Sequence, residues 1–290
     1  MSGGGSLTFT EPPLRTVGEW LEDAIALLER GEVESARLSA YLILEEITGH
    51  PRSRLIAFPE TCLNSAEMEK ANELLFRRTR HEPMAYILGS KEFRNLTLKV
   101  APAVLIPRPE SEGLVDRAAE IAPGAERILD AGTGSGCLAL SLAEAFPRAR
   151  VFGCDRSRAA LEVARENDAM RKVDWFESEW LSPIAREGLD LVVSNPPYLT
   201  DAEVDTLAPQ VARYEPVEAL RGGPDGCDAY RILIPQAGAC LRPGGRILLE
   251  ISPTVVREVG KLLERTGFKE VLFHHDLAGR ERYAAASLPD

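Results

Sequence analysis

Apolar residues recur at helical spacing in the first part of the chain. The clearest stripe consists of Val17, Trp20, Leu21, Ala24, Ile25 and Leu28. Thr16 and Glu19 have the spacing of a capping box at its start, and Gly31 follows its end. The stripe therefore predicts an amphipathic helix that begins near Thr16 and buries one face.

Two more helices are expected before the pattern changes. One precedes Gly49, and the other begins at Asn64 or Ser65, where Glu67 completes a second capping box with Asn64. The last helix must end before Pro83, because the residue before a proline disfavours helical backbone. We expect a small helical domain over residues 1–83.

The period of the apolar residues then changes to two. Leu96, Leu98 and Val100 alternate with polar residues, as in a half-buried strand. We interpret residues 84–108 as a β-hairpin linker.

From residue 109 onward, short apolar runs alternate with helical patterns. The runs are Ile128–Leu129, Val151–Cys154, Val173–Phe176, Leu191–Val193, Ile247–Ile251 and Val271–Phe273. This repetition predicts an α/β, Rossmann-like domain over residues 109–290, with helices on both faces of a parallel sheet.

Composition narrows the classes of function. The 290 residues include 34 Lys and Arg against 45 Asp and Glu, a formal net charge of −11 that disfavours a surface for nucleic-acid phosphates. No apolar run is long enough to span a membrane, and the flexible amino-terminal stretch MSGGGSLTFTEPP lacks the regions of a signal peptide. We therefore expect a cytoplasmic protein that does not bind membranes.

Cysteine and histidine usage gives no sign of a metal site or a disulfide framework. The five cysteines include no CxxC pair, and the four histidines have no metal-ligand spacing. We expect no bound metal, and the cysteines to be buried as small apolar residues.

The first run ends in an acidic residue and a glycine-rich turn, Asp130, Ala131, Gly132, Thr133, Gly134, Ser135 and Gly136. Glycines at this edge of a sheet let the backbone approach a ligand closely. A dinucleotide motif would place its third glycine at position 137, where this chain has Cys137. The turn therefore favours a ligand without a pyrophosphate, against the simpler alternative of a tight structural turn.

Asp155 ends the next strand. A carboxylate at that place can accept hydrogen bonds from both hydroxyls of a ribose. The alternative is that Asp155 only caps the helix that begins near Ser157. Together with the glycine turn, Asp155 favours a nucleoside ligand.

The motif Asn195, Pro196, Pro197 and Tyr198 follows the fourth run, on the same edge of the sheet. A turn is the simplest interpretation of Asn-Pro. Two prolines also remove two donors and leave carbonyl oxygens free to accept. The Asn195 side-chain oxygen and the Pro196 carbonyl can then bind both N–H bonds of a planar NH₂ group, with Tyr198 against its plane.

An NH₂ group conjugated to a carbonyl or a ring is a weak nucleophile. Binding both N–H bonds directs the nitrogen lone pair toward an electrophilic carbon, such as a sulfonium methyl. The combination resembles S-adenosylmethionine-dependent methyltransferases that act on amide or exocyclic amino nitrogen.

The order of the motifs along the chain limits the resemblance to one family of these methyltransferases. The segments that carry it are Glu82-Pro83, Tyr86–Gly89, Glu92-Phe93, Leu105–Glu112, Ile128–Gly136, Asn195–Tyr198, Tyr214–Pro216 and Gly222–Gly226. This set resembles the PrmC/HemK family of peptide chain release factor glutamine N5-methyltransferases. The resemblance implies a seven-stranded class I methyltransferase fold whose last strand, near Arg282–Ala285, is antiparallel.

The resemblance also implies residue roles. Asp130 and Gly132 to Gly136 would bind the cofactor, with the glycine turn against its methionine portion. Asp155 would hold the ribose, and the ring of Trp180 would lie against the adenine. Asn195 to Tyr198 would bind the substrate glutamine amide, with Asn195 also near the cofactor and Asn195, Pro196 and Tyr198 as the catalytic residues.

Three positions depart from the family's usual pattern. The family usually has Asp at Glu179 and Thr at Ser111, and Pro235 falls inside a helical pattern that it should kink or shorten. Arg108, Glu110 and Glu112 would form either a lid over the pocket or structural ion pairs.

The partners that the resemblance implies are class I release factors, bound at the glutamine of their GGQ loop by a monomeric enzyme with a helical recognition domain. Three alternatives remain at this point. They are an adenine N6-methyltransferase acting on DNA or RNA, a ribosomal-protein glutamine methyltransferase, and a noncatalytic protein that binds S-adenosylmethionine or has lost that ability.

Overall fold

The computed structural model describes residues 15–182 and 188–290, so the amino-terminal stretch expected to be flexible lies outside the described residues. The chain divides into two compact units, Met1–Leu88 and Gly89–Asp290. Each unit has its own hydrophobic core, and each is described separately.

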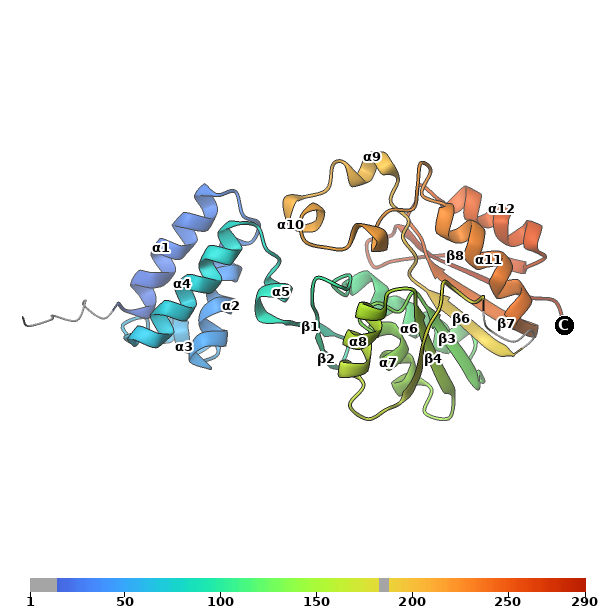
Figure 1. Cartoon of the computed structure of the whole chain (residues 1–290), viewed down its shortest axis with the longest axis horizontal. Helices are drawn as coiled ribbons and strands as arrows, with labels where there is room; N and C mark the ends of the chain where they lie inside the picture. The colour runs from blue at the N-terminus through green and yellow to red at the C-terminus, as the bar shows by residue number, and fades with distance from the viewer. Residues whose placement is uncertain (1–14, 183–187) are drawn as a thin grey trace, which may run out of the picture. The chain divides into compact units, whose positions relative to one another are not determined.

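The first unit is helical, as the periodicity predicts. Its helices are α1 (Val17–Arg30), α2 (Ala36–Thr48), α3 (Arg52–Ala57), α4 (Ser65–Thr79) and α5 (Met84–Leu88) (Figure 1). Both predicted capping boxes are present, at Thr16 with Glu19 and at Asn64 with Glu67. All six apolar residues of the predicted stripe on α1 are buried, so the prediction of an amphipathic first helix is confirmed.

A buried cation joins three parts of this unit. Arg78, on α4, is 4% exposed. Its guanidinium donates to Ser39 Oγ at 3.1 Å and to the carbonyls of Glu34 and Glu82, each at 2.9 Å. Arg78 therefore ties α4 to α2 and to the chain on either side of them.

The second unit is built on a seven-stranded sheet with the order β5-β4-β3-β6-β7-β9-β8. Its strands are β3 (Arg127–Ala131), β4 (Arg150–Asp155), β5 (Val173–Glu177), β6 (Leu189–Ser194), β7 (Leu241–Glu250), β8 (Lys269–His275) and β9 (Glu281–Ser287). The first five are parallel, and β9 pairs antiparallel with both β7 and β8. The predicted seven-stranded α/β fold with an antiparallel last strand is confirmed.

Helices cover both faces of the sheet (Figure 1). The longer ones are α6 (Glu112–Ile121), α7 (Cys137–Ala145), α8 (Arg158–Asn167), α11 (Asp228–Cys240) and α12 (Val256–Thr266). Short helices are η1 (Pro109–Ser111), α9 (Asp201–Val204), α10 (Pro209–Ala212) and η2 (Val217–Ala219). Neighbouring strand residues enter different cores, because successive side chains point to opposite faces. Ile128 packs with the core on the α6 and α7 side, and Leu129 with the core on the α11 and α12 side.

The predicted hairpin is present as β1 (Ser90–Phe93) and β2 (Leu96–Lys99). It belongs to the second unit, where Phe93 and Leu98 are buried in the core beneath α6. The Lys99 backbone also exchanges hydrogen bonds with the side chain of Asn167, at 2.7 and 3.0 Å. The expected linker at 84–108 therefore contains helix α5, which closes the first unit, and a hairpin that is part of the second.

Two local predictions are met only in part. Pro235 was expected to kink or shorten its helix, and α11 runs through it for 13 residues, so the shorter helix is wrong. Of the five cysteines, Cys154, Cys227 and Cys240 are buried as predicted, whereas Cys62 is exposed and Cys137 is partly buried.

Arg78→Met tests the buried cation of the first unit. We expect the free energy of unfolding to fall by about 2–4 kcal/mol, because the change leaves the buried Ser39 hydroxyl and the carbonyls of Glu34 and Glu82 without their donor. Lys70→Met on the exposed side of the same helix should change it by less than about 0.5 kcal/mol. Chemical denaturation of both variants measures the difference, and equal effects would contradict the assigned role of Arg78.

Candidate active site

Three parallel strands bring the predicted site residues to one edge of the sheet. Asp130 on β3 is level with Gly153 on β4 and with Val193 on β6. Gly132, Asp155 and Asn195 each follow two residues later along their own segments. The glycine turn, the carboxylate and the NPPY motif therefore emerge side by side, because β3 lies between β4 and β6.

Asp130 supports the glycine turn from beneath. It is fully buried, and its Oδ2 accepts from the Thr133 hydroxyl and from the Ala139 amide. Oδ1 is also buried and has no hydrogen-bond partner among the described residues. Burial raises the pKa of Asp130 to about 7, against the effect of the two hydrogen bonds.

Asp155 is held at the tip of β4 by two backbone amides. Its Oδ2 accepts from Gly134 at 2.9 Å, and its Oδ1 accepts from Ser157 at 2.8 Å. Ser157, and not Asp155, caps α8 through its side chain. Because each carboxylate oxygen keeps spare acceptor capacity, Asp155 can bind a diol while it remains anchored.

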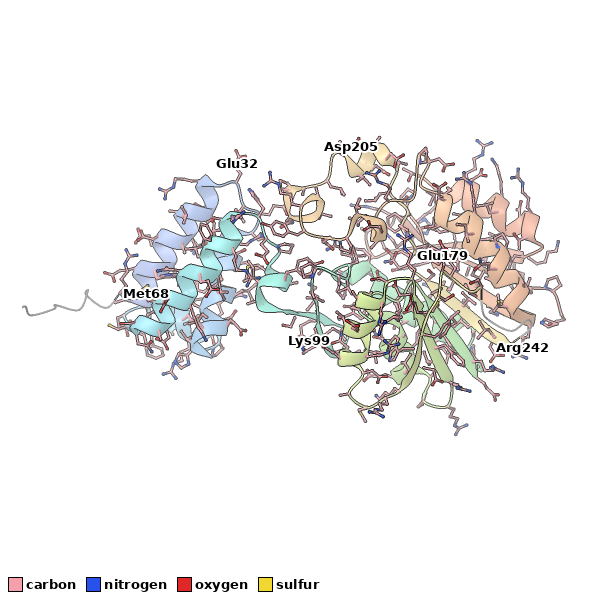
Figure 2. The ribbon with its side chains drawn as sticks, in the orientation of Figure 1. Glu32, Met68, Lys99, Glu179, Asp205 and Arg242 are labelled. Atoms are coloured by element: carbon pink, nitrogen blue, oxygen red, sulfur yellow. The ribbon has the colours of Figure 1, made fainter. Side chains whose placement is uncertain are left out.

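Trp180 lies beside the glycine turn. A Cβ built on Gly132, which is exposed and has φ +74°, would be 3.4 Å from Cζ3 of the Trp180 ring. Glu179, labelled in Figure 2, is exposed and precedes this tryptophan. The indole therefore provides an aromatic surface next to the exposed backbone of the turn.

The turn is also supported by residues that belong to no sequence motif. The ring of Trp175 packs so close to Gly153 and Gly136 that an added Cβ would lie 2.3 and 2.9 Å from it. Asn167 Nδ2 donates to the carbonyl of Ser135 at 2.9 Å. Both contacts lie on the side of the turn that faces α8, so they fix its shape without occupying its exposed face.

The NPPY motif is anchored by hydrogen bonds at both ends. Asn195 Nδ2 donates to Ser111 Oγ at 3.0 Å, and the Tyr198 hydroxyl donates to Glu250 Oε1 at 3.2 Å. Burial raises the pKa of Tyr198, and the charge of Glu250 adds to the rise. The phenol thus stays protonated and available as a donor.

A second glycine-rich segment, Gly222–Gly226, packs against the backbone of this motif. Leu199 exchanges backbone hydrogen bonds with Leu220 and Gly222, at 3.0 and 2.7 Å. A Cβ on Gly226, where φ is +75°, would lie 2.4 Å from the carbonyl oxygen of Tyr198. In the sequence this segment is only one of the family's motifs, and its spacing gives no signal that it contacts the NPPY backbone.

The Leu105–Glu112 segment is joined to the region after β6 by an ion pair. Arg108 Nη2 lies 2.6 Å from Glu215 Oε1, and the Ile106 amide donates to Glu215 Oε2 at 3.0 Å. Glu110 and Glu112 form other bonds: the Glu110 carbonyl accepts from Tyr283, and Glu112 Oε1 accepts from the Arg94 amide. Of the two expectations for Arg108, the structure shows the ion pair.

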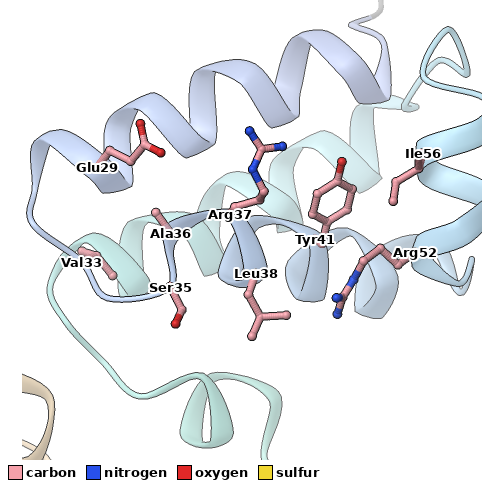
Figure 3. Close-up of a pocket in the computed structure, with 9 residues that line it drawn as sticks. All are labelled: Glu29, Val33, Ser35, Ala36, Arg37, Leu38, Tyr41, Arg52 and Ile56. Atoms are coloured by element: carbon pink, nitrogen blue, oxygen red, sulfur yellow. The ribbon is translucent and has the colours of Figure 1, made fainter.

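The first unit contains a separate groove of about 650 Å³ on α1, α2 and α3 (Figure 3). Val33, Leu38 and Ile56 line it together with Arg37 and Tyr41. None of the predicted site residues lines this groove. The lining combines apolar side chains with one carboxylate, Glu29, and two guanidinium groups, Arg37 and Arg52.

Comparison with known proteins agrees with this geometry. Residues 19–89 match the family model of the PrmC N-terminal domain, and residues 111–223 match that of the methyltransferase small domain. A release factor glutamine methyltransferase from Geobacter sulfurreducens is 38% identical over 279 residues, which cover 94% of this chain and 97% of the relative. One from Moorella thermoacetica is 40% identical over 92% of this chain and 96% of its own.

The chain belongs to the release factor glutamine methyltransferase family. The fold has relatives among solved structures as well. A methyltransferase from Pyrococcus furiosus covers 69% of this chain and 92% of its own length, with a TM-score of 0.52 and 19% identity. The prediction of this family from the ordered motifs is confirmed.

The described residues contain no group of three or more His, Cys, Asp or Glu suited to a metal ion. Within the same ranges, no helix is long and apolar enough to cross a membrane.

Asp130→Asn tests the buried carboxyl. The pKa of this group rises from its ordinary value of 3.8 in the unfolded chain to about 7 in the folded chain, so its contribution to stability falls as pH rises across that window. We expect the unfolding free energy of the variant, relative to the original, to increase with pH in this window by up to ~1.4 kcal/mol per pH unit. Parallel pH dependences in denaturation experiments between pH 4 and 7 would contradict this assignment.

Gly226→Ala tests the close approach of the second glycine segment. The added Cβ meets the Tyr198 carbonyl at a positive φ, so we expect a stability loss of at least about 2 kcal/mol and a displaced NPPY backbone. Gly124→Ala is the matched control, because nothing lies within 4 Å of a Cβ there. The two variants are compared by thermal unfolding and by their rates of methyl transfer. If Gly226→Ala changes neither, the contact is dispensable.

Proposed function

We propose that this protein transfers a methyl group from S-adenosylmethionine to the side-chain amide nitrogen of a glutamine in peptide chain release factors. Family membership supports the reaction, since relatives that cover nearly the whole chain carry that name. The observation that carries the proposal in the structure is the Asn195 amide, fixed through Nδ2 by Ser111 beside the glycine turn.

The bond to Ser111 decides how Asn195 can meet the substrate. Since Nδ2 is already a donor to Ser111, Oδ1 is the atom left to accept. Pro196 has no N–H, and its carbonyl oxygen follows directly in the chain. These two acceptors bind the two N–H bonds of the glutamine amide and hold its nitrogen toward the methyl donor.

The residues of the β3 and β4 edge fit the cofactor. The exposed backbone of Gly132 admits a close ligand, the anchored carboxylate of Asp155 suits the ribose diol, and the Trp180 ring suits a base. When bound, S-adenosylmethionine supplies the electrophilic methyl carbon. We assign cofactor binding to Asp130, Gly132, Thr133, Gly134, Ser135, Gly136, Asp155, Trp180 and Asn195, with Asp130 acting from beneath the turn.

The finer partner assignments are part of the same proposal. We assign the target to the glutamine of the GGQ loop in class I release factors, and recognition of the protein substrate to the helical unit. The groove on α1–α3 supports the latter, because it combines apolar side chains with Arg37 and Arg52. A cytoplasmic monomer that does not act on nucleic acid stays our prediction.

The adenine alternative shares the same chemistry, because adenine offers a similar NH₂ group. The formal charge of −11 and the names of the relatives argue against it. The ribosomal-protein alternative is disfavoured by the helical unit, which matches the PrmC N-terminal domain.

Methyl transfer from radiolabelled S-adenosylmethionine decides between these substrates. The protein is incubated with a purified class I release factor, with the same factor carrying glutamate in place of the GGQ glutamine, and with rRNA and DNA. We expect label only in the unaltered factor. Label in nucleic acid, or in the altered factor, would overturn the assignment.

Asn195→Ala should reduce turnover of the release factor at least about a hundredfold, because it removes one of two acceptors that orient the amide. Much of the cofactor binding, measured by calorimetry, should remain, because the other residues assigned to the cofactor are unchanged. The thermal unfolding midpoint should change little, since Asn195 is only partly buried. Unchanged turnover would exclude Asn195 from the mechanism.

A further inference from the structure

The bond from Asn195 to Ser111 is one link in a longer chain that ends on a buried carboxylate. Ser111 Oγ donates to Glu250 Oε2 at 2.6 Å, and Tyr198 donates to the other oxygen, Glu250 Oε1. Glu250 is the last residue of β7 and is 1% exposed. The carboxylate thus lies beneath both ends of the NPPY motif.

The number of protons on each group fixes the direction of every hydrogen bond in this series. Ser111 has a single hydroxyl proton, and it donates that proton to Glu250 Oε2. The Ser111 oxygen can then only accept from Asn195, which requires the NH₂ side of the Asn195 amide to face it. The amide oxygen of Asn195 is consequently turned away from Ser111.

The pKa of Glu250 is raised by burial, and its polar neighbours reduce that rise. Burial raises the pKa of Glu250, whereas the Ser111 hydrogen bond and the charge of Arg282 oppose the rise. Glu110 is the nearby like charge, and Tyr198 adds a second hydrogen bond to the carboxylate. Tyr230 donates to the backbone carbonyl of Glu250 at 2.7 Å and so holds the residue without competing for its carboxylate.

We infer that Glu250 is a positioning residue that sets the polarity of the substrate site: through Ser111 it turns the Asn195 oxygen toward the substrate, and through Tyr198 it holds the aromatic ring. The inference rests on the proposed function. It makes the site a set of acceptors, which binds an amide NH₂ and repels the carboxylate of glutamate.

Loss of this polarity should change specificity as well as rate. Glu250→Gln introduces an NH₂ group that can donate to Ser111, so the Ser111 proton becomes free to point at Asn195 and reverse its amide. Asn195 would then present NH₂ to the substrate. If the variant only made the site less rigid, the affinities for glutamine and glutamate would fall by the same factor. If the Asn195 amide is reversed, the site loses its preference for glutamine over glutamate.

The experiment compares the original protein, Glu250→Gln, Ser111→Ala, Ser111→Thr and Ser141→Ala. Ser111→Thr keeps the hydroxyl and should restore the original behaviour. Ser141→Ala is the matched control, because the Ser141 hydroxyl is buried and has no partner among the described residues. Turnover and KM are measured with the release factor, and the factor with glutamate at the target position is tested as a competitive inhibitor.

We expect kcat to fall about tenfold or more in Glu250→Gln and Ser111→Ala, from the loss of a charge-assisted hydrogen bond and the free rotation of the amide. For the release factor with glutamate at the target position, the ratio of its inhibition constant to KM should be at least about tenfold lower in these two variants than in the original protein. The double variant should lose no more kcat than the worse single variant, since both changes break the same series of hydrogen bonds.

Suppose that the original protein labels the release factor, and that the variants keep both its kcat and its preference for glutamine over glutamate. This result would overturn the inference about Glu250 and leave the proposed function standing. Absence of labelling by the original protein would instead overturn the proposed function. If Glu250→Gln does not fold, the contrast between Ser111→Ala and Ser111→Thr gives the same decision.

Discussion

The pairing of β3 with β4 on one side and β6 on the other is the constraint on which the site depends. Parallel strands end at the same edge, and the register places Asp130, Gly153 and Val193 at one level. The glycine turn, Asp155 and Asn195 then follow within a few residues of that level. Binding residues from three distant parts of the sequence are therefore aligned by backbone hydrogen bonds, before any side chain contributes.

Beneath this edge lie two buried carboxyl groups with different surroundings. Asp130 has one oxygen bonded within its own turn and one without a partner among the described residues. Glu250 has both oxygens occupied by hydroxyl donors. Burying an acid is costly unless hydrogen bonds compensate for lost water. At the glycine turn the compensating bonds come from Thr133 and Ala139, which are close in the chain, and they leave Oδ1 without a partner among the described residues. At the NPPY motif the compensating bonds come from Ser111 and Tyr198, which are distant in the chain.

Sequence patterns predict the structural features of this protein that are formed by residues close together in the chain. The capping boxes at Thr16 and Asn64, the alternation in Leu96–Val100 and the turn after Asp130 each involve neighbours in the chain, so spacing alone reveals them. The motifs also place Asp155 and Asn195 at strand ends, because an apolar run followed by a polar residue marks such an end. The family follows from the order of these motifs.

What spacing does not reveal is contact between distant segments. Ser111 and Glu250 are 139 residues apart, and Arg108 and Glu215 are 107 apart. In the sequence, Glu250 is only a polar residue within the run Ile247–Ile251. The burial of Phe93 and Leu98 is another such contact, because it depends on the tertiary core beneath α6.

The double role of Asn167 has a consequence for how this enzyme can be rearranged by evolution or by engineering. Its amide holds Ser135 in the glycine turn while the same side chain pairs with the backbone of Lys99 at the end of the hairpin. A catalytic module excised at residue 109 would lose the strand that orients Asn167. The transferable module begins at Gly89, so exchange of amino-terminal domains between related enzymes is best made at the Leu88–Gly89 junction.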